Sequence, residues 1–477
     1  MAIIGSPKGT HDLITDEARA YDYINKVCEE VATIYGFDPL LTPIFEANEL
    51  FARGVGDATD IVRKEMYVFK DKGNRLMALR PEGTAGVIRS IIANKLYATN
   101  DLPLRLYYSG PMFRYERPQL GRYRQFHQFG VESVGSTSIL ADFEVILLAF
   151  HSLQALGFDD ITIKINSLGR NEARVAYREA LKQYYKPLLG KVCPDCKVRY
   201  EQNPLRMLDC KVESDVKFAK SAPKITDYLT TEDKDDLAFI RDSLENYGAK
   251  VVVDYGLVRG LDYYSGIIFE FEYVPTSGKD YGAIGGGGRY DKLVEDLGGP
   301  PLEGVGFAFG LERLHHILKE EGKLDHIPMK DDLMIVGMGE KTRTAAFSLL
   351  TTLRTYGLRG TTNFDDKSFK SIFKIAESRG ARYALILGEN ELEREVVSVR
   401  NLETQEQTEV AFDEIVDYIC HLFGIRGHHD CRCHDEDHEC CDGDCDCECH
   451  GDDCECEADE CHDPDCTCKN DKKKEKV

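Results

Sequence analysis

The sequence predicts an α+β domain with a helical insertion, then a small α/β domain, then a tail without a hydrophobic core. Up to about residue 325, strand-like runs recur among well-separated helices, which is typical of a largely antiparallel sheet packed with helices. From 332 to 424 strands and helices alternate, which predicts a mixed sheet. From 427 onward apolar side chains are almost absent, so we expect a disordered tail unless metal orders it.

The first domain is expected over 1–325. A helix is predicted over 16–35, where apolar residues recur at three- and four-residue spacing and where Asp12 or Thr15 could cap the first turn. Residues 170–248 are helix-rich, charged and poor in motifs, which indicates an insertion between two halves of the domain. Strands are expected around 66–70, 76–80, 104–108, 128–134, 161–166, 250–255 and 267–273.

The second domain is expected over 326–426, and the tail over 427–477. Helices of this domain are expected over 341–356, 368–379 and 413–423, with Gly424 ending the last one. Its strands are expected at DLMIVGM (332–338), GLRGTT (357–362), YALILG (383–388), EVVSVRNL (395–402) and QTEVAF (407–412).

The composition indicates a soluble protein with no membrane partner. Hydrophobic residues make up 42% of the chain, yet no run approaches 18 consecutive apolar residues. The first residues lack a basic segment followed by an apolar run, so we expect a cytoplasmic protein. Much of the net charge of −23 comes from 428–468, which hold 17 Asp/Glu and one Arg. The moderately acidic remainder does not exclude nucleic acid, because phosphates respond to local basic patches.

Two segments carry polar groups suited to a substrate site. In LRPEGTAG (79–86), a carboxylate beside a small residue and a hydroxyl could hold an ammonium group; the alternative is a turn in which Thr84 caps a helix. FRYERPQLGRYRQFHQFGVES (113–133) interleaves arginines with aromatic rings and predicts a long hairpin turning at Gln119–Gly121. Arginine forks suit phosphate and rings suit stacking on bases, whereas the alternative is a solvated basic hairpin.

Two further segments are unusual for sheet core. In LVRGLDYYSGIIFEF (257–271), Arg259 lies among residues that look like sheet core, so it needs an anion or a salt-bridge partner. GAIGGGGRYDKLVEDLGG (282–299) lacks the pattern of a phosphate-binding loop, but glycines in a strand leave room for a ligand on the sheet. GVGFAFGLERL (304–314) starts a helix whose Arg313 could reach a phosphate.

Together these segments resemble the bacterial type of histidyl-tRNA synthetase over about residues 1–425. LTPIFE (41–46) is similar to the first motif of class II synthetases, which lies at their dimer interface; 113–132 is similar to the second motif and 306–314 to the third. LVRGLDYY and GGGGRYD resemble two segments peculiar to the histidine enzymes. The resemblance implies an α+β class II synthetase catalytic domain, a small α/β anticodon-binding domain and a homodimer.

The resemblance also implies the reaction. The family activates L-histidine with ATP and Mg²⁺ to histidyl-adenylate, then transfers it to the 3′ end of tRNA-His, with release of pyrophosphate and AMP. Arg114 and Arg259 are implied as the catalytic residues that flank the α-phosphate and the carboxylate. The residues implied for histidine are Glu82, Gly83, Thr84, Gln128, Glu132, Tyr263 and Tyr264; those for ATP are Arg114, Arg122 and Arg313; those for the tRNA acceptor end are Gln119, Gly121 and Arg122.

Two other functions compete with the synthetase. One is a paralogue such as the regulatory subunit of ATP phosphoribosyltransferase, which lacks the anticodon domain and departs from the RGLDYY segment. The other is a metal-buffering protein whose body is a relic, which the intact set of site residues opposes.

Cysteines occur in two places. Cys193, Cys196 and Cys210 lack an obvious fourth ligand, so we expect a structural turn there in preference to a zinc site. The tail holds 12 Cys and 6 His, and its thiolates suit Zn²⁺ or Cu⁺, although a solvated acidic tail with incidental cysteines is the alternative. Its Cys-x-Cys pairs are built from Cys431, Cys433, Cys445, Cys447, Cys449, Cys454, Cys456, Cys466 and Cys468.

Overall fold

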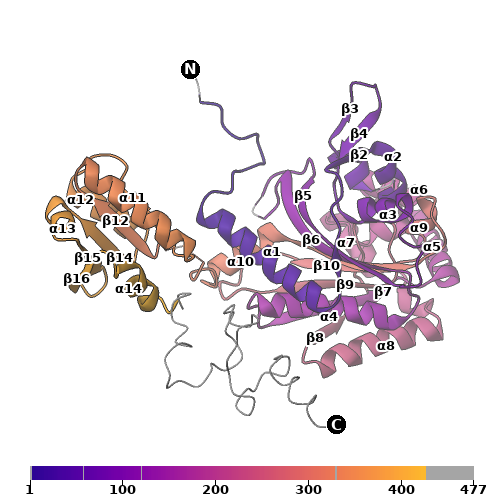
Figure 1. Ribbon diagram of the computed structural model, residues 1–477. Helices are drawn as coiled ribbons and strands as arrows, with labels where there is room; N and C mark the ends of the chain where they lie inside the picture. Colours follow the sequence, from indigo (N-terminus) through magenta and orange to yellow (C-terminus); the bar gives the residue numbers. More distant parts are fainter. Residues whose placement is uncertain (1–2, 57–58, 120, 328–329, 426–477) are drawn as a thin grey trace, which may run out of the picture. The chain divides into compact units, whose positions relative to one another are not determined.

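The protein divides into two compact units, residues 1–328 and 329–477, and each is described by itself. Figure 1 shows the computed structural model, which describes residues 3–56, 59–119, 121–327 and 330–425. The tail predicted from 427 onward lies outside the described residues. Within them, no helix has the length and apolar character that crossing a membrane requires.

An eight-stranded sheet organises the first unit (Figure 1). Only the outer pairs β1–β5 and β7–β8 are parallel, and the other neighbours are antiparallel, as the sequence predicts. In spatial order the strands are β1 (Asp38–Pro39), β5 (Leu104–Phe113), β6 (Gln125–Val134), β11 (Gly304–Gly310), β10 (Gly285–Tyr290), β9 (Ser265–Tyr273), β7 (Ile161–Ser167) and β8 (Lys250–Val253).

Long helices bury the largest core against this sheet. The helices are α1 (Asp16–Ile34), α4 (Ile139–Ala155), α8 (Thr231–Asn246) and α10 (Leu311–Glu320). Phe129, Phe269 and Phe309 of the sheet are buried in this core. A second core joins α3 (Thr84–Ala93) and α9 (Leu293–Asp296) to side chains such as Tyr108 and Tyr290. The site described below therefore has a rigid sheet beneath it.

The remaining elements of the first unit form a small sheet and the insertion. The small sheet has the order β2 (Phe45–Ala47), β4 (Leu76–Leu79), β3 (Val68–Lys70). Helix α2 (Asn48–Phe51) and two π-helical turns, η1 (Ala52–Gly56) and η2 (Ile61–Glu65), lie between β2 and β3 in the chain. The insertion is helical as predicted, with α5 (Asn171–Tyr185), η3 (Lys186–Leu188), α6 (Pro194–Gln202), η4 (Pro204–Met207), α7 (Glu213–Lys220) and η5 (Ile225–Asp227) before α8.

The second unit contains the predicted mixed sheet. Its order is β13 (Gly360–Thr362), β12 (Leu333–Gly337), β14 (Tyr383–Leu387), β15 (Val396–Asn401), β16 (Gln407–Ala411), with the first three strands parallel. Its helices are α11 (Glu340–Thr355), α12 (Phe369–Ser378), α13 (Glu389–Glu393) and α14 (Ile415–Leu422). Gly424 follows the last helix at φ +67°, the left-handed conformation that glycine permits.

Some local details differ from what the sequence predicts. Helix α1 begins where expected, but Thr15 adopts φ 50° and makes no side-chain capping bond. The strand ranges expected from the sequence do not include β10 and β11, because their glycines carry little of the β-branched signal by which strands are recognised, although the glycine run of β10 was considered as part of a strand.

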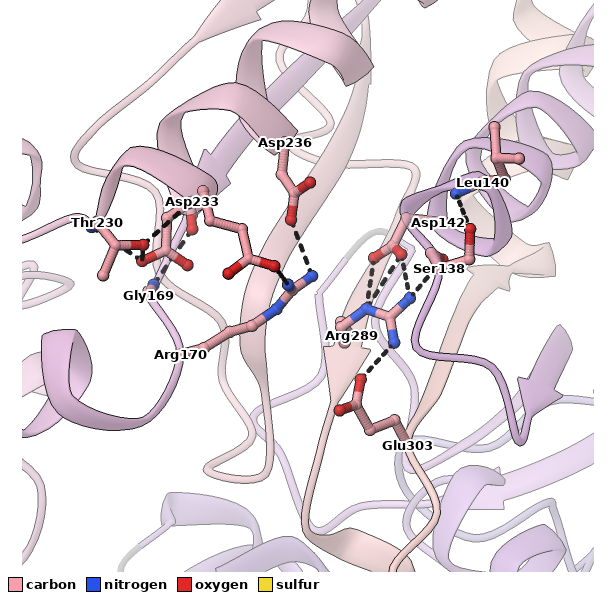
Figure 2. A network of polar contacts seen from close by, with 12 residues as sticks. Ser138, Leu140, Asp142, Gly169, Arg170, Thr230, Asp233, Asp236, Arg289 and Glu303 are labelled. Atoms are coloured by element: carbon pink, nitrogen blue, oxygen red, sulfur yellow. Dashed lines mark hydrogen bonds and ion pairs between the residues drawn. The ribbon is translucent and has the colours of Figure 1, made fainter.

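Arg289 of β10 is the largest fully buried charged side chain in the first unit. It forms an ion pair with Asp142 of α4, and its Nε lies 3.0 Å from Asp142 Oδ2 (Figure 2). Its Nη1 donates to Glu303 Oε2 at 2.8 Å and to the Ser136 carbonyl at 2.9 Å, and its Nη2 donates to the Ser138 carbonyl at 3.0 Å. Sheet, helix and connecting loops are thus joined through one guanidinium.

A second arginine beside this network links the segment after β7 to helix α8. Arg170, which follows β7, lies 3.0 Å from Asp236 of α8 (Figure 2). Helix α8 is itself closed at its start by a capping box, in which Thr230 and Asp233 exchange side-chain and backbone hydrogen bonds.

Replacing Arg289 by Met should destabilise the first unit by about 3–5 kcal/mol, because Asp142 is then left buried without its cation. Urea unfolding followed by circular dichroism would measure this loss. Arg241→Met, at an exposed ion pair on α8, is the control and should change little. The double variant Arg289→Met/Asp142→Leu should regain much of the stability; a double variant as unstable as the single one contradicts this account.

Candidate active site

A cavity of about 570 Å³ lies within the first unit, over the glycine-rich strands of the sheet. It collects side chains from all four segments singled out in the sequence. The predicted site residues that line it are Glu82, Thr84, Arg114, Gly121, Arg122, Gln128, Glu132, Arg259, Tyr263, Tyr264 and Arg313. These residues span positions 82 to 313 in the sequence. The antiparallel pairing of β6, β11, β10 and β9 brings the segments that carry them together.

Glu82 holds the start of helix α3. Its Oε2 accepts from the Thr84 backbone N–H and its Oε1 from the Ala85 N–H, both at 2.8 Å. The expected alternative, a cap provided by Thr84, is therefore wrong: Thr84 is already the first helical residue. Its hydroxyl instead donates to Glu132 Oε1 at 2.6 Å. Both residues are buried, so the helix start and the carboxylate of β6 form one polar unit.

Glu132 is the most enclosed carboxylate of the cavity, with 1% of the residue exposed. Its second oxygen, Oε2, accepts from the Tyr290 hydroxyl at 2.7 Å. Burial raises the pKa of Glu132 to about 8, although the hydrogen bonds from Thr84 and Tyr290 oppose the rise. Nearby Glu82 adds to the rise by like-charge repulsion. The side chain is thus poised to exchange a proton near neutral pH.

Tyr290 and Tyr108 line the cavity but were not among the predicted site residues. Tyr290 belongs to the GGGGRYD segment, so the motif itself was the available signal. Tyr108 lies on β5, outside every quoted motif, and its ring fills the space beside Gly83 and Gly130. Only the fold reveals that role.

The glycines of β10 and β11 leave room for functional side chains. A Cβ on Gly306 would lie 2.0 Å from Glu132 Oε2, and one on Gly286 would lie 2.8 Å from Arg259 Nη1. These residues have ordinary strand conformations, so close approach rather than backbone angle requires glycine here. The glycine run therefore accommodates the site's own carboxylate and arginine.

Arg259 lies in the loop before β9, not in sheet core as its sequence context indicated. It forms an ion pair with Glu270 of β9, which is the salt-bridge alternative considered for it. Its Nε nevertheless remains buried without a partner within the described residues. Tyr263 and Tyr264 follow in the same turn, their rings 4.6 Å apart, and both face the cavity.

Three more arginines enter the cavity from other elements. Arg114, at the end of β5, donates from Nε to the Pro81 carbonyl at 2.8 Å. Arg122 lies 3.6 Å from Glu116 on the connection between β5 and β6. Arg313 of α10 donates to the Ala283 carbonyl, and burial together with the nearby Arg122 lowers its pKa. Several cationic side chains in one cavity suit a polyanion such as a nucleoside triphosphate.

The other predicted residues have distinct positions. Gln128 shares the cavity with Glu132, four residues along β6, and its Oε1 is buried without a partner in the described part of the chain. Gln119 and Arg122 pair through both backbone hydrogen bonds at the hairpin turn, but Gln119 does not line the cavity. Gly83 does not line it either; a Cβ there would lie 2.1 Å from the Tyr108 ring.

Among the residues that the structure describes, none form a preformed metal site in the cavity. Glu116, Glu270 and Glu312 line it, but within the described residues no three metal-ligating side chains converge there. A Mg²⁺ ion usually keeps several waters and is carried by substrate phosphates with one or two carboxylates. The residues present fit that mode of binding, in which the triphosphate brings the ion.

The antiparallel sheet, the arginine-bearing hairpin and the α/β second unit define a class II aminoacyl-tRNA synthetase. A family profile described as histidyl-tRNA synthetase matches residues 9–314, and one described as anticodon binding domain matches 332–422. The chain belongs to the histidyl-tRNA synthetase family. The family and the fold class expected from the sequence are confirmed.

Individual relatives agree with this membership. The histidine–tRNA ligase of Thermosipho melanesiensis is 48% identical over 413 residues, which cover 86% of this chain and 96% of the relative. The crystal structure of apo Staphylococcus aureus histidyl-tRNA synthetase matches with a TM-score of 0.75 and 36% identity, covering 87% of this chain and all of that one. A Bacillus halodurans structure titled ATP phosphoribosyltransferase regulatory subunit/histidyl-tRNA synthetase shares the fold at 22% identity, with a TM-score of 0.58, covering 81% of this chain and 99% of that one.

The raised pKa of Glu132 predicts a pH-dependent stability. Between the ordinary glutamate pKa of about 4.3 and about 8, the folded protein binds a proton that the unfolded chain has lost. The contribution of Glu132 to the free energy of unfolding is therefore fully present below the lower value and is lost as the pH rises through the upper one. Relative to Glu132→Gln, the parent should lose on the order of 4 kcal/mol between pH 5 and 9.

Denaturant unfolding of both proteins at several pH values measures this difference, since the other titrating groups are common to both. A difference that stays constant across the range contradicts a strongly raised pKa.

Proposed function

We propose that this chain is a histidine–tRNA ligase, which activates L-histidine with ATP and transfers it to the 3′ end of tRNA-His. The observation that carries the proposal is the cavity, which combines a buried carboxylate, Glu132, with four arginines from three separate parts of the first unit. A carboxylate substrate is already a nucleophile, so the enzyme's task is to bring it to an anionic phosphate. Positioning and positive charge are the means that such a reaction needs.

Histidine recognition is assigned to the polar unit around Glu132. Glu132 and Tyr264 read the two imidazole nitrogens, one accepting and one donating as the tautomer requires. Glu82, Thr84 and Gln128 hold the α-amino group, and the unpartnered Oε1 of Gln128 supports this role. An apolar side chain of similar shape would exclude water from Glu132 without adding a hydrogen bond to those from Thr84 and Tyr290, which penalises the wrong amino acid.

The arginines are assigned to the phosphates. Arg114 and Arg259 flank the α-phosphate and the substrate carboxylate, where negative charge concentrates as the adenylate forms. Arg122 and Arg313 bind the rest of the triphosphate, and a Mg²⁺ ion brought by the triphosphate would supply further positive charge there. The pairing of Arg259 with Glu270 holds this guanidinium in place before substrate arrives.

The tRNA and a second subunit are assigned to further segments of the chain. The hairpin turn of Gln119, Gly121 and Arg122 meets the acceptor end, and the domain at 326–426 binds the anticodon, leaving 1–325 as the catalytic domain. Leu41 and Phe45, in the segment similar to the class II dimer motif, are 84% and 55% exposed. Apolar exposure of this size supports a homodimer interface. An enzyme that charges tRNA serves translation, so we place it in the cytoplasm.

Histidine-dependent exchange of labelled pyrophosphate into ATP tests the proposal directly. Robust exchange with L-histidine, and little with other amino acids, is expected. Absence of exchange would favour the competing function, a regulatory protein of the same fold. Added tRNA-His should then become charged, which distinguishes a full synthetase from an amino-acid-activating relative.

Arg259→Ala should lower the exchange rate by several orders of magnitude, because one of the two groups that stabilise the developing charge is lost. The circular dichroism spectrum should be unchanged, since the remaining Glu270 is not deeply buried and can be solvated. Arg241→Ala, at an exposed arginine of α8, is the matched control and should retain the parent rate. A near-normal rate in Arg259→Ala would refute its catalytic role.

For the tail, we propose binding of Zn²⁺ or Cu⁺ on grounds of sequence alone. Twelve cysteines and six histidines between 428 and 468 offer soft ligands, and the intervening carboxylates attract cations. Titration of a peptide covering 428–477 with Zn²⁺ under reducing conditions should show stoichiometric uptake. If the peptide takes up no metal, the proposal is contradicted and the alternative, an acidic tail with incidental cysteines, is favoured.

A further inference from the structure

Three cysteines and one aspartate converge inside the helical insertion. Cys193 and Cys196 stand at the start of α6, Cys210 follows η4, and Asp215 lies in the first turn of α7. One ligand atom from each lies within 4.8 Å of all the others. Cys193 Sγ is 3.9 Å from Cys210 Sγ, which is 3.6 Å from Asp215 Oδ2.

These separations match a tetrahedral metal site rather than a disulfide. Zinc–sulfur bonds of about 2.3 Å place two thiolates of a tetrahedron about 3.8 Å apart. A disulfide requires about 2.05 Å between sulfurs. The fourth ligand, which the cysteine spacing did not reveal, is supplied by Asp215, five residues beyond Cys210 and brought back by the start of α7.

The surroundings hold these groups in place. Cys196, Cys210 and Asp215 are buried, and Cys193 is half-buried. Asp215 accepts from the Cys193 backbone N–H and from the Ser214 hydroxyl, both at 2.9 Å, and the Cys196 N–H donates to Cys193 Sγ at 3.4 Å. Such donors orient metal ligands and stabilise their negative charge. Buried charges are commonly paired with a cation or bound to a metal, and Asp215 is only 2% exposed.

We propose that Cys193, Cys196, Cys210 and Asp215 bind a structural Zn²⁺ ion. Three thiolates with one carboxylate form a closed, sulfur-rich set of four, which suits zinc in a structural role and leaves no open position for catalysis. The insertion has its own small core, built around residues such as Tyr185, Leu205 and Ile225. Small cores commonly depend on a metal or a cross-link, and the ion occupies the position where α6, η4 and α7 meet.

This ion would also fix one wall of the cavity. Leu208, Asp209 and Lys211, which neighbour Cys210 in the chain, line it. Just before them, Asn203 donates to Asp262 Oδ1 at 2.8 Å, and Arg206 donates to the Gly260 carbonyl at 2.9 Å. Asp262 and Gly260 belong to the loop that carries Arg259. The inference concerns metal content, so it does not rest on the proposed ligase activity.

The test uses the full-length chain with the twelve tail cysteines replaced by serine, so that the tail offers no thiolates. Purified under reducing conditions with Zn²⁺ and dialysed, it should retain one zinc per chain by elemental analysis. Cys196→Ala and Asp215→Asn in this background should lose the zinc or bind it at least tenfold more weakly. Cys420→Ala, at a buried cysteine of the second unit, is the control and should retain it.

A second measurement keeps the proposal testable if a variant fails to fold. Co²⁺ added to the metal-free parent should give thiolate-to-cobalt absorption, and Zn²⁺ should abolish it by displacement. Metal removal should lower the Tm of the parent and leave that of Cys196→Ala unaffected. A parent without zinc whose three thiols all react freely, or one in which Cys193 and Cys210 form a disulfide, overturns the proposal.

Discussion

The buried ion pair between Arg289 and Asp142 is the constraint on which the site depends. It fixes β10 to α4 at the point where the register of β10 against β9 shifts, between Gly288 and Arg289. The next residue is Tyr290, whose hydroxyl donates to Glu132. A guanidinium with no exposure is costly to desolvate, but here its partners saturate it from several sides, so it specifies one arrangement of sheet and helix.

The polar side chains of the cavity are connected to strand β10 by a series of hydrogen bonds. Tyr290 holds one oxygen of Glu132 and Thr84 holds the other, while Glu82 holds the start of α3 that carries Thr84. The carboxylate is enclosed, which raises its pKa. The same enclosure requires glycine at 306, because a Cβ there would lie 2.0 Å from Glu132 Oε2. The position of the carboxylate therefore restricts which residues the neighbouring strand can contain.

The cationic part of the cavity is supported differently. Its arginines come from the hairpin connection, from the loop before β9 and from α10, and each is held by a backbone carbonyl or a carboxylate. The insertion contributes to this support, because Asn203 and Arg206 bind the loop that carries Arg259. A structural ion beneath them would stiffen the loop without taking part in the reaction.

The sequence by itself determined the family, the two folded units and most strands, and most of the site residues it indicated do line the cavity, because motifs and hydrophobic periodicity are local properties of the chain. It did not indicate the strand ranges of β10 and β11, whose glycines lack strand propensity. It also missed Tyr108 and the position of Asp215 beside the three cysteines of the insertion. Only the tertiary structure decided those points, together with the partners of Arg259 and Glu132. The contacts of these residues join positions that are far apart in the sequence, or positions that the start of a helix brings together. Whether such residues touch depends on tertiary packing and not on their spacing along the chain.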